Sequence, residues 1–137
     1  QWQVEQTTRA VVAALDQDFD WINCYQSRVG PLEWIGPATE DEIKRAGAEG
    51  KNLVVVPIAF VSEHSETLVE LDIEYRELAV EFGVPTYIRV DTVRADDAFI
   101  GGLAAAVNRT LSGSDNLVSG EGGRICPQSR TRCAFAI

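Results

Sequence analysis

The stretch Leu53-Val54-Val55-Val56-Pro57-Ile58-Ala59-Phe60 decides the fold class of this 137-residue chain. It is apolar on both alternating faces, which is typical of a strand in a parallel sheet that helices cover on both sides. Pro57 marks the end of the hydrogen-bonded ladder, because proline has no backbone N–H to donate. We therefore expect a strand over 52–60 that belongs to an α/β sheet.

Helical and strand-like segments alternate around this run. The expected helices are 4–15, 39–47, 66–82 and 96–111, and the other expected strands are 20–25 and 85–90. Thr39 is expected to open its helix as a capping box, in which its hydroxyl binds the Glu42 amide and the Glu42 side chain reaches back. The order α-β-α-β-α-β-α predicts a parallel sheet with right-handed crossovers, although three strands are few for such a sheet.

Composition excludes several classes of protein. The chain has 12 basic and 21 acidic residues and a net charge of −9, which argues against a nucleic-acid partner, because phosphates would be repelled. At 45% hydrophobic and 24% charged, it is an ordinary globular sequence. The longest apolar stretch, 53–61, is far shorter than the roughly 20 residues of a membrane helix. The chain has no Met and opens in helix-like sequence, so we expect a piece of a longer protein.

The sequence divides into two parts. Residues 1–111 are expected to form the α/β domain, and residues 112–137 a flexible Gly/Ser-rich tail that carries Cys126 and Cys133. With Cys24 the chain has three cysteines, an odd number that does not indicate a disulfide framework. We therefore expect a reducing, intracellular setting.

A row of carboxylates runs along the helix expected over 66–82. At about 100° per residue, the acids on one stripe are Glu66, Glu70, Glu74, Glu77 and Glu81. Most acidic stripes are solvated faces, but here no basic residue offsets the repulsion and apolar residues flank both edges. We therefore interpret the Glu66–Glu70–Glu74 row as the lining of a cleft, where carboxylates bind divalent cations or accept protons.

Two loops lie where ligands bind in open α/β sheets, beyond the carboxyl ends of strands. The loop 61–66 holds His64, the only histidine, but one histidine is more often structural, and His-x-Glu lacks the two-histidine zinc spacing. The loop 26–34 holds Trp34, which would either cover the core or form an aromatic wall for a flat ligand. Arg28, in the same loop, is suited to pair with a ligand carboxylate.

Three stretches together closely resemble the ferrochelatase family. They are Tyr25-Gln26-Ser27-Arg28-Val29-Gly30-Pro31 followed by Trp34, then Val54-Val55-Val56-Pro57-Ile58-Ala59-Phe60-Val61-Ser62-Glu63-His64-Ser65-Glu66-Thr67-Leu68, and Glu70-Leu71-Asp72-Ile73-Glu74-Tyr75. The resemblance runs in order and with matched gaps over residues 4–111. It implies a lyase-type metal chelatase that inserts ferrous iron into protoporphyrin IX to give protohaem, the last step of haem synthesis.

The resemblance also implies a fold and a site. The fold is a Rossmann-like three-layer parallel sheet with helices on both faces, present here as the incomplete half of a two-half protein with the porphyrin cleft between its halves. Glu66 and His64 take the catalytic roles of proton abstraction or metal handling. The implied metal-handling residues are Glu63, Glu66, Glu70 and Glu74. The implied porphyrin-binding residues are Gln26, Ser27, Arg28, Val29 and Trp34.

The implied partners are protoporphyrin IX, ferrous iron and the missing N-terminal half of the enzyme. The family's second cleft histidine belongs to that upstream half, so we expect this chain to be inactive by itself. We expect a cytoplasmic location, with peripheral contact with the inner membrane left open. The oligomeric state is also left open.

Three hypotheses accompany the resemblance. The first is a C-terminal [2Fe–2S] cluster, which some family members carry, because Ile125-Cys126-Pro127 is similar to that region. A cluster requires four thiolates, and the tail offers only Cys126 and Cys133, so two free thiols are favoured. The second is a catalytically incomplete module that binds a tetrapyrrole or metal. The third is a chelatase that acts on coproporphyrin or another tetrapyrrole.

Overall fold

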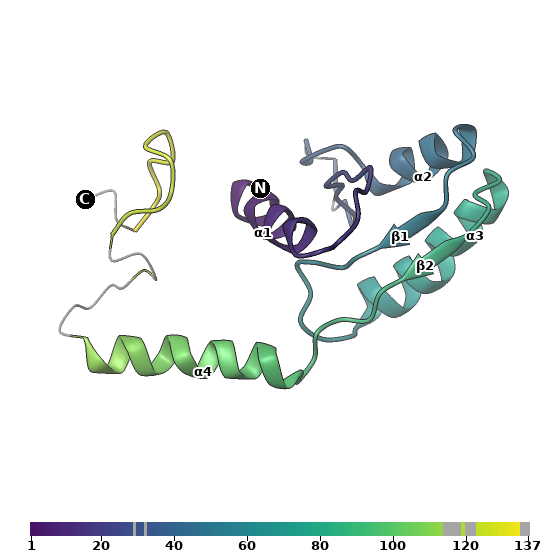
Figure 1. The fold of residues 1–137 in the computed structure, drawn as a ribbon. Helices are drawn as coiled ribbons and strands as arrows, with labels where there is room; N and C mark the ends of the chain where they lie inside the picture. Colours follow the sequence, from purple (N-terminus) through teal and green to yellow (C-terminus); the bar gives the residue numbers. More distant parts are fainter. Residues whose placement is uncertain (29, 32, 114–118, 120–122, 135–137) are drawn as a thin grey trace. The chain divides into compact units, whose positions relative to one another are not determined.

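The computed structural model of the chain describes residues 1–28, 30–31, 33–113, 119 and 123–134. The chain forms two compact units, 1–94 and 95–137. The elements of the first unit are α1 (Trp2–Ala13), α2 (Thr39–Ala48), β1 (Leu53–Val55), the π-helix η1 (Glu66–Glu74), α3 (Tyr75–Glu81) and β2 (Tyr87–Arg89). The second unit contains α4 (Asp97–Ser112) (Figure 1).

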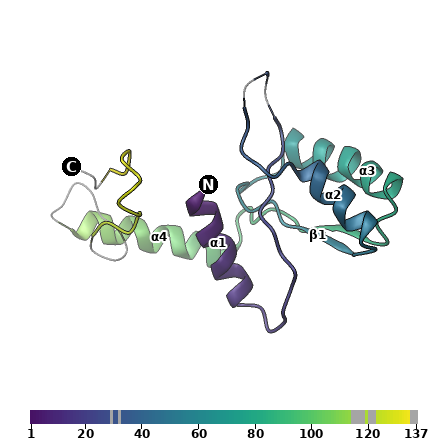
Figure 2. The same ribbon diagram turned by 90° about the horizontal axis from the view of Figure 1, so that it is seen from above.

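The strands β1 and β2 pair in parallel, with Leu53 opposite Tyr87 and Val55 opposite Arg89. Parallel neighbours need a long crossover connection, and η1 and α3 provide it (Figures 1 and 2). This pairing confirms the predicted parallel α/β unit. Both strands are three residues long, shorter than the expected runs of 52–60 and 85–90.

The core of the first unit lies between the strands and their helices. The buried apolar residues are Ile43 and Ala46 of α2, Leu71 of η1, Tyr75 and Ala79 of α3, and Val84. From the strands, Leu53, Val55 and Tyr87 pack against this cluster. One face of the sheet is therefore covered, as the alternation of side chains along a strand requires.

The other face of the strand pair is exposed. The side chains of Val54 and Ile88 point to it and keep 56% and 50% of their surface accessible. Helices were expected on both faces, because the run is apolar throughout. Within the described residues of the first unit, that second layer is not formed.

The strand expected over 20–25 is reduced to one bridge, so that prediction was wrong in extent. Tyr25 bridges Ala38: its N–H donates to Pro37 O at 2.9 Å, and its carbonyl accepts from the Thr39 N–H at 3.0 Å. Asp20, at the other end of the segment, is held by an ion pair with Lys51. A ladder needs a neighbour along its length, and the described residues supply one at Tyr25 alone.

The capping box expected at Thr39 is wrong. The N-cap is Ala38, and no side chain caps the helix. Thr39 is instead the first helical residue and is buried, with its side chain hydrogen-bonded to Cys24. Glu42 pairs with Arg45 at 2.7 Å rather than reaching back. The bridge to Tyr25 draws Thr39 inward, so its hydroxyl has a partner in the interior.

The helix expected over 66–82 has a different winding in its first half. It is a π-helix over Glu66–Glu74, followed by an α-helix over Tyr75–Glu81. A π-helix bonds residue i to residue i+5 and so has a wider turn. The count of 100° per residue therefore fails over 66–74, the part on which the predicted carboxylate row depends.

The second unit begins with α4, which confirms the helix expected over 96–111 to within one residue. Asp96 is its N-cap, because its carboxylate accepts hydrogen bonds from the N–H groups of Ala98 and Phe99 at 3.0 and 3.1 Å. In the tail, the Arg124 guanidinium donates to the carbonyls of Cys126 and Pro127, at 3.0 and 2.7 Å. None of the helices among the described residues has the length and apolar character needed to cross a bilayer.

Gly47 provides a test of the packing between α2 and the end of α3. A Cβ at Gly47 would lie 2.1 Å from the Phe82 carbonyl oxygen, which is backbone and cannot rotate away. We expect Gly47→Ala to lower the free energy of unfolding by about 3 kcal/mol, the upper end for overpacking, in urea titrations.

Gly101 in α4 is the matched control, because a Cβ there meets nothing within 4 Å. Gly101→Ala should instead strengthen the helix by about 1 kcal/mol of propensity and raise the circular dichroism signal of helix. If Gly47→Ala were as stable as the parent chain, the described packing of α2 on Phe82 would be contradicted.

Candidate functional site

The loop after β1 ends in a histidine whose backbone starts η1. The His64 carbonyl accepts hydrogen bonds from the N–H groups of Thr67 and Leu68, at 3.1 and 2.8 Å, while the His64 N–H donates to Thr67 Oγ1 at 3.0 Å. The imidazole packs edge-on against the Phe60 ring, with centroids 4.5 Å apart. These contacts hold the histidine ring at the N-terminal end of η1.

His64 and Glu66 form a close pair. The imidazole Nδ1 lies 2.6 Å from Glu66 Oε2, and Ser65 Oγ donates to the same oxygen at 2.9 Å. Both side chains are partly open to solvent, with exposures of 34% and 44%. Hydrogen bonds from the Glu66 N–H, then from Ser65 and His64, lower the pKa of Glu66. The pair is therefore accessible and suited to exchange a proton or to contact a cation.

Glu70, one turn further along η1, is bound by donors on every side. Its Oε1 accepts from the Ser27 N–H at 2.9 Å and from the Tyr75 hydroxyl at 2.8 Å. Its Oε2 accepts from Gln26 Nε2 at 3.1 Å and from the Ser27 hydroxyl. Burial alone would raise the pKa of Glu70, but the hydrogen bonds outweigh it and the pKa lies below its usual value. This carboxylate joins η1 to the loop 26–34.

Glu63 is held by cationic and neutral donors. Its Oε1 accepts from Arg89 Nη1 at 2.8 Å, the Thr92 N–H at 3.0 Å, and Arg94 Nη2 at 3.3 Å. The Thr92 N–H foremost, with both arginines, keeps the pKa of Glu63 well below its usual range. Glu63 is thus already engaged with the protein, and its predicted role with metal stays a prediction.

Glu74 closes the predicted row at the last position of η1, where it is exposed. Glu77 and Glu81 are exposed on α3. The structure therefore does not present the acids as one uniform stripe: Glu66 is half-exposed, and Glu70 is partly buried and hydrogen-bonded. The wider turn of η1 is the physical reason for the difference.

The predicted porphyrin loop lies next to η1. Gln26 Nε2 donates to the Glu66 carbonyl at 2.8 Å, which ties the loop to the first residue of η1. Trp34 is exposed, and its Nε1 donates to the Gln26 carbonyl at 3.2 Å. Ser27 has a positive φ of 58° and Arg28 is exposed. Val29 lies outside the described residues.

Sequence reasoning missed three residues of this region: Tyr75, Asp72 and Arg89. The Tyr75 hydroxyl reaches Glu70 across five positions, a spacing that an α-helical count does not align. Arg89 bonds both Asp72 and Glu63. The sequence feature that could have indicated this network is Arg89 itself, a basic residue inside the otherwise apolar segment 87–90. A charge in a buried strand requires a partner of opposite charge.

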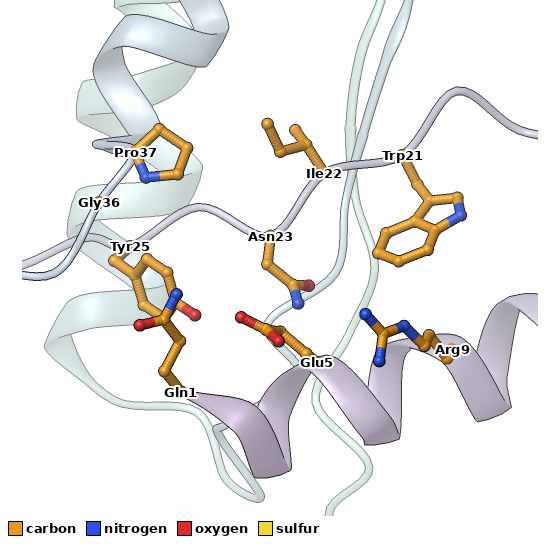
Figure 3. A pocket seen from close by; sticks show the side chains of 9 residues that line it. All are labelled: Gln1, Glu5, Arg9, Trp21, Ile22, Asn23, Tyr25, Gly36 and Pro37. Carbon is orange, nitrogen blue, oxygen red and sulfur yellow. The ribbon is translucent and has the colours of Figure 1, made fainter. Parts of the chain in front are cut away.

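A cavity of about 340 Å³ lies between α1 and the two segments 21–25 and 36–37 (Figure 3). The side chains of Glu5, Asn23 and Tyr25 converge in it. Asn23 Nδ2 and the Tyr25 hydroxyl are buried without a hydrogen-bond partner among the described residues. None of the predicted metal or porphyrin residues lines this cavity.

The described residues contain no group of three histidine, cysteine, aspartate or glutamate side chains arranged to hold a metal ion. In the tail, the thiols of Cys126 and Cys133 are in hydrogen-bond contact. Two thiols are half of the four thiolates that a [2Fe–2S] cluster requires. Cys24 is partly buried in the first unit beside Thr39, and burial raises its pKa.

Comparison with known proteins now identifies the family. A family model described as Ferrochelatase matches residues 1–111. The chain belongs to the ferrochelatase family. The predicted resemblance is thereby confirmed over most of the chain.

Curated relatives agree with that match. The Caulobacter vibrioides ferrochelatase is 52% identical over 133 residues, which cover 97% of this chain and 38% of the relative. The Phenylobacterium zucineum ferrochelatase is 54% identical over 132 residues, which cover 96% of this chain and 38% of that relative. The Rickettsia bellii ferrochelatase is 46% identical over 136 residues, which also cover 96% and 38%. The chain thus spans about two fifths of the length of these relatives.

The Glu70 network predicts a dependence of stability on pH. Because its folded pKa is depressed, Glu70 stabilises the fold above its usual pKa of 4.5, and this contribution is lost as pH falls through the lower, folded value. Glu70→Gln should unfold at lower urea concentration than the parent chain at pH 7, and the difference should shrink as pH falls below 4.5.

Glu81→Gln is the control, since Glu81 is exposed at the end of α3. It should keep the pH dependence of the parent chain. A constant difference between Glu70→Gln and the parent chain from pH 7 to pH 3 would contradict the assignment.

Proposed function

We propose that this chain is the C-terminal portion of a ferrochelatase that inserts ferrous iron into protoporphyrin IX to give protohaem, the lyase reaction that completes haem synthesis. The observation that carries the proposal is the accessible His64–Glu66 pair, with Nδ1 and Oε2 2.6 Å apart at the end of the strand-to-helix loop. The pair lies beside a loop that presents an exposed tryptophan, Trp34. Membership in the ferrochelatase family supports the same reaction.

The chemistry of insertion explains why such a pair is useful. The porphyrin must lose two pyrrole protons, and the hydrated ferrous ion must shed water before it meets the nitrogens. Glu66 is an accessible carboxylate whose pKa lies below its usual value, so it is ionised at neutral pH and can contact the incoming ion. It can also pass a pyrrole proton onward, although the lowered pKa makes it a weak base. His64, at hydrogen-bond distance, provides a second site for that proton.

The porphyrin would lie against the loop formed by residues 26–34. Trp34 offers an exposed aromatic face to a flat macrocycle, and the exposed Arg28 would face its carboxylates. The N–H and hydroxyl of Ser27 both donate to Glu70, so Ser27 would contribute only after those bonds are released. Gln26 connects this loop to the Glu66 carbonyl and to the Glu70 carboxylate, at 2.8 and 3.1 Å. Val29 stays a member of this set only through the family resemblance, since it lies outside the described residues.

The metal route proposed for this enzyme follows η1. Glu66 and Glu74, at the first and last positions of η1, have accessible carboxylates. Glu70 lies between them, and its four donors would have to release it before it could bind metal. Glu63, in the loop that precedes η1, would contact the metal ion at the N-terminal end of the same route.

The complete enzyme would add the N-terminal half and finish a three-layer sheet, with residues 1–111 in the chelatase domain and 112–137 as a tail. The exposed Val54 and Ile88 side chains on the open sheet face support this arrangement, because such apolar surface is normally covered. The family's second cleft histidine would come from the added half, so the chain alone would not insert metal. We place the enzyme in the cytoplasm and leave peripheral contact with the inner membrane open.

A second function is a binding module that holds a tetrapyrrole or a metal ion without insertion. The observation that favours it is that the chain spans 38% of the length of its ferrochelatase relatives. A third candidate is a chelatase that acts on coproporphyrin or another tetrapyrrole. It would insert metal by the same chemistry but would have different residues in the tetrapyrrole-binding pocket.

The decisive experiment is substitution of Glu66 in the complete protein. We expect Glu66→Ala and Glu66→Gln to lower the rate of iron or zinc insertion into protoporphyrin IX at least about 100-fold, the lower end for loss of a general base. Porphyrin affinity, measured by fluorescence quenching, should change little, because the aromatic loop is intact.

The matched control is Glu81→Gln, which removes a charge at the exposed end of α3. Its insertion rate should equal that of the parent enzyme. Full activity of Glu66→Gln would refute the assigned role. If the complete parent protein binds porphyrin but never inserts metal, the binding module is the correct function.

A further inference from the structure

A buried arginine outside the predicted site connects three segments of the first unit. Arg89, the last residue of β2, has a side chain that is 6% exposed. Its Nε donates to Asp72 Oδ1 at 2.7 Å and its Nη2 to Asp72 Oδ2, so the carboxylate is bound by two parallel hydrogen bonds. Its Nη1 donates to Glu63 Oε1 at 2.8 Å. One guanidinium therefore binds η1 and the loop before it to the end of β2.

This geometry requires an arginine. A planar guanidinium presents several N–H donors in one fork and can serve two carboxylates at once, whereas a lysine ammonium is a point charge. Asp72 and Glu63 both face the same buried cation. Without the Arg89 guanidinium, the carboxylates of Asp72 and Glu63 would lie close together and be poorly solvated. Their mutual repulsion would then move them apart.

The contacts of Arg89 can affect the positions of His64 and Glu66 through the backbone that joins these residues to Glu63 and Asp72. Glu63 directly precedes His64, and Asp72 lies in the π-helix that begins at Glu66. The side chains of His64 and Glu66 are half-exposed, and among the described residues their partners are local, namely Phe60, Ser65 and each other. Their mutual distance thus depends on the backbone bonds of His64 to Thr67 and Leu68 and on how the loop that carries His64 is held against η1.

We propose that Arg89 is a positioning residue for metal insertion, which binds Glu63 and Asp72 together and thereby sets the distance between His64 and Glu66. The role in insertion rests on the proposed function. The effect of Arg89 on the position of His64 does not depend on the proposed function, so the role in insertion and the effect on His64 can be tested separately.

A second arginine provides the matched control. Arg45 on α2 also joins two carboxylates, Glu42 at 2.7 Å and Glu49 at 3.1 Å, but it is 41% exposed and all three residues belong to α2 or its C-cap. Arg45→Met removes the same kind of interaction without touching the loop. Ile43→Val, a substitution in the buried core on the same helix, controls for a general loss of stability.

His64 is the only histidine of the chain, so ¹⁵N-histidine labelling gives one imidazole signal set from the 137-residue protein. We expect Arg89→Met, at one fixed pH, to shift the His64 imidazole resonances toward those of a free histidine peptide and to broaden them. Arg89→Lys, which keeps the charge and folds more readily, should shift them part of the way. Arg45→Met and Ile43→Val should leave them in place.

In the complete enzyme, we expect Arg89→Lys to lower kcat for metal insertion about 10- to 100-fold, the usual effect of losing a supporting contact, with little change in KM for porphyrin. Unmoved His64 resonances in folded Arg89→Lys and Arg89→Met chains, or an unchanged kcat, would overturn the proposal. If the complete parent enzyme inserts no metal, the proposed function fails, and the His64 resonances alone decide whether Arg89 positions the pair.

Discussion

The parallel pairing of β1 with β2 is the constraint on which the first unit depends. Parallel neighbours must be joined by a crossover that returns the chain to the starting edge, and here the crossover is η1 followed by α3. The loop that enters the crossover leaves from the carboxyl end of β1, beside the residues that follow β2. The same constraint therefore brings Glu63 to Arg89 and Thr92, and places the His64–Glu66 pair at the edge where ligands bind in such sheets.

The carboxylates at this edge differ in their partners, and their partners decide what each can do. Glu63 is bound to a buried guanidinium and a backbone N–H, and Glu70 to neutral donors from a loop and a tyrosine. Both are held in place by those bonds. Glu66 has a histidine and a serine as partners and remains open to solvent. Of these three carboxylates, Glu66 is thus the most accessible, whereas Glu63 and Glu70 join segments of the fold.

Several features were predictable from residue types alone. The apolar run at 53–60 predicted a parallel strand, and the apolar and acidic pattern after Ser65 predicted the crossover helix. The position of His64 and Glu66 beyond a strand end also predicted a ligand site, which stays a prediction. The strand over 20–25 failed, because a strand needs a paired neighbour and local pattern does not show one. The capping box at Thr39 failed, because a bridge from Tyr25 drew that residue into the core.

By itself, the sequence determined the parallel α/β unit and the family, because these follow from local pattern and from a specific order of residues. The role of His64 and Glu66 stays a prediction. The tertiary structure decided which carboxylates are held and which are accessible. It also decided the winding of η1, the contact of Tyr75 with Glu70, and the burial of Arg89 between Asp72 and Glu63. These depend on contacts between segments far apart in the chain, and no periodicity along one segment contains that information.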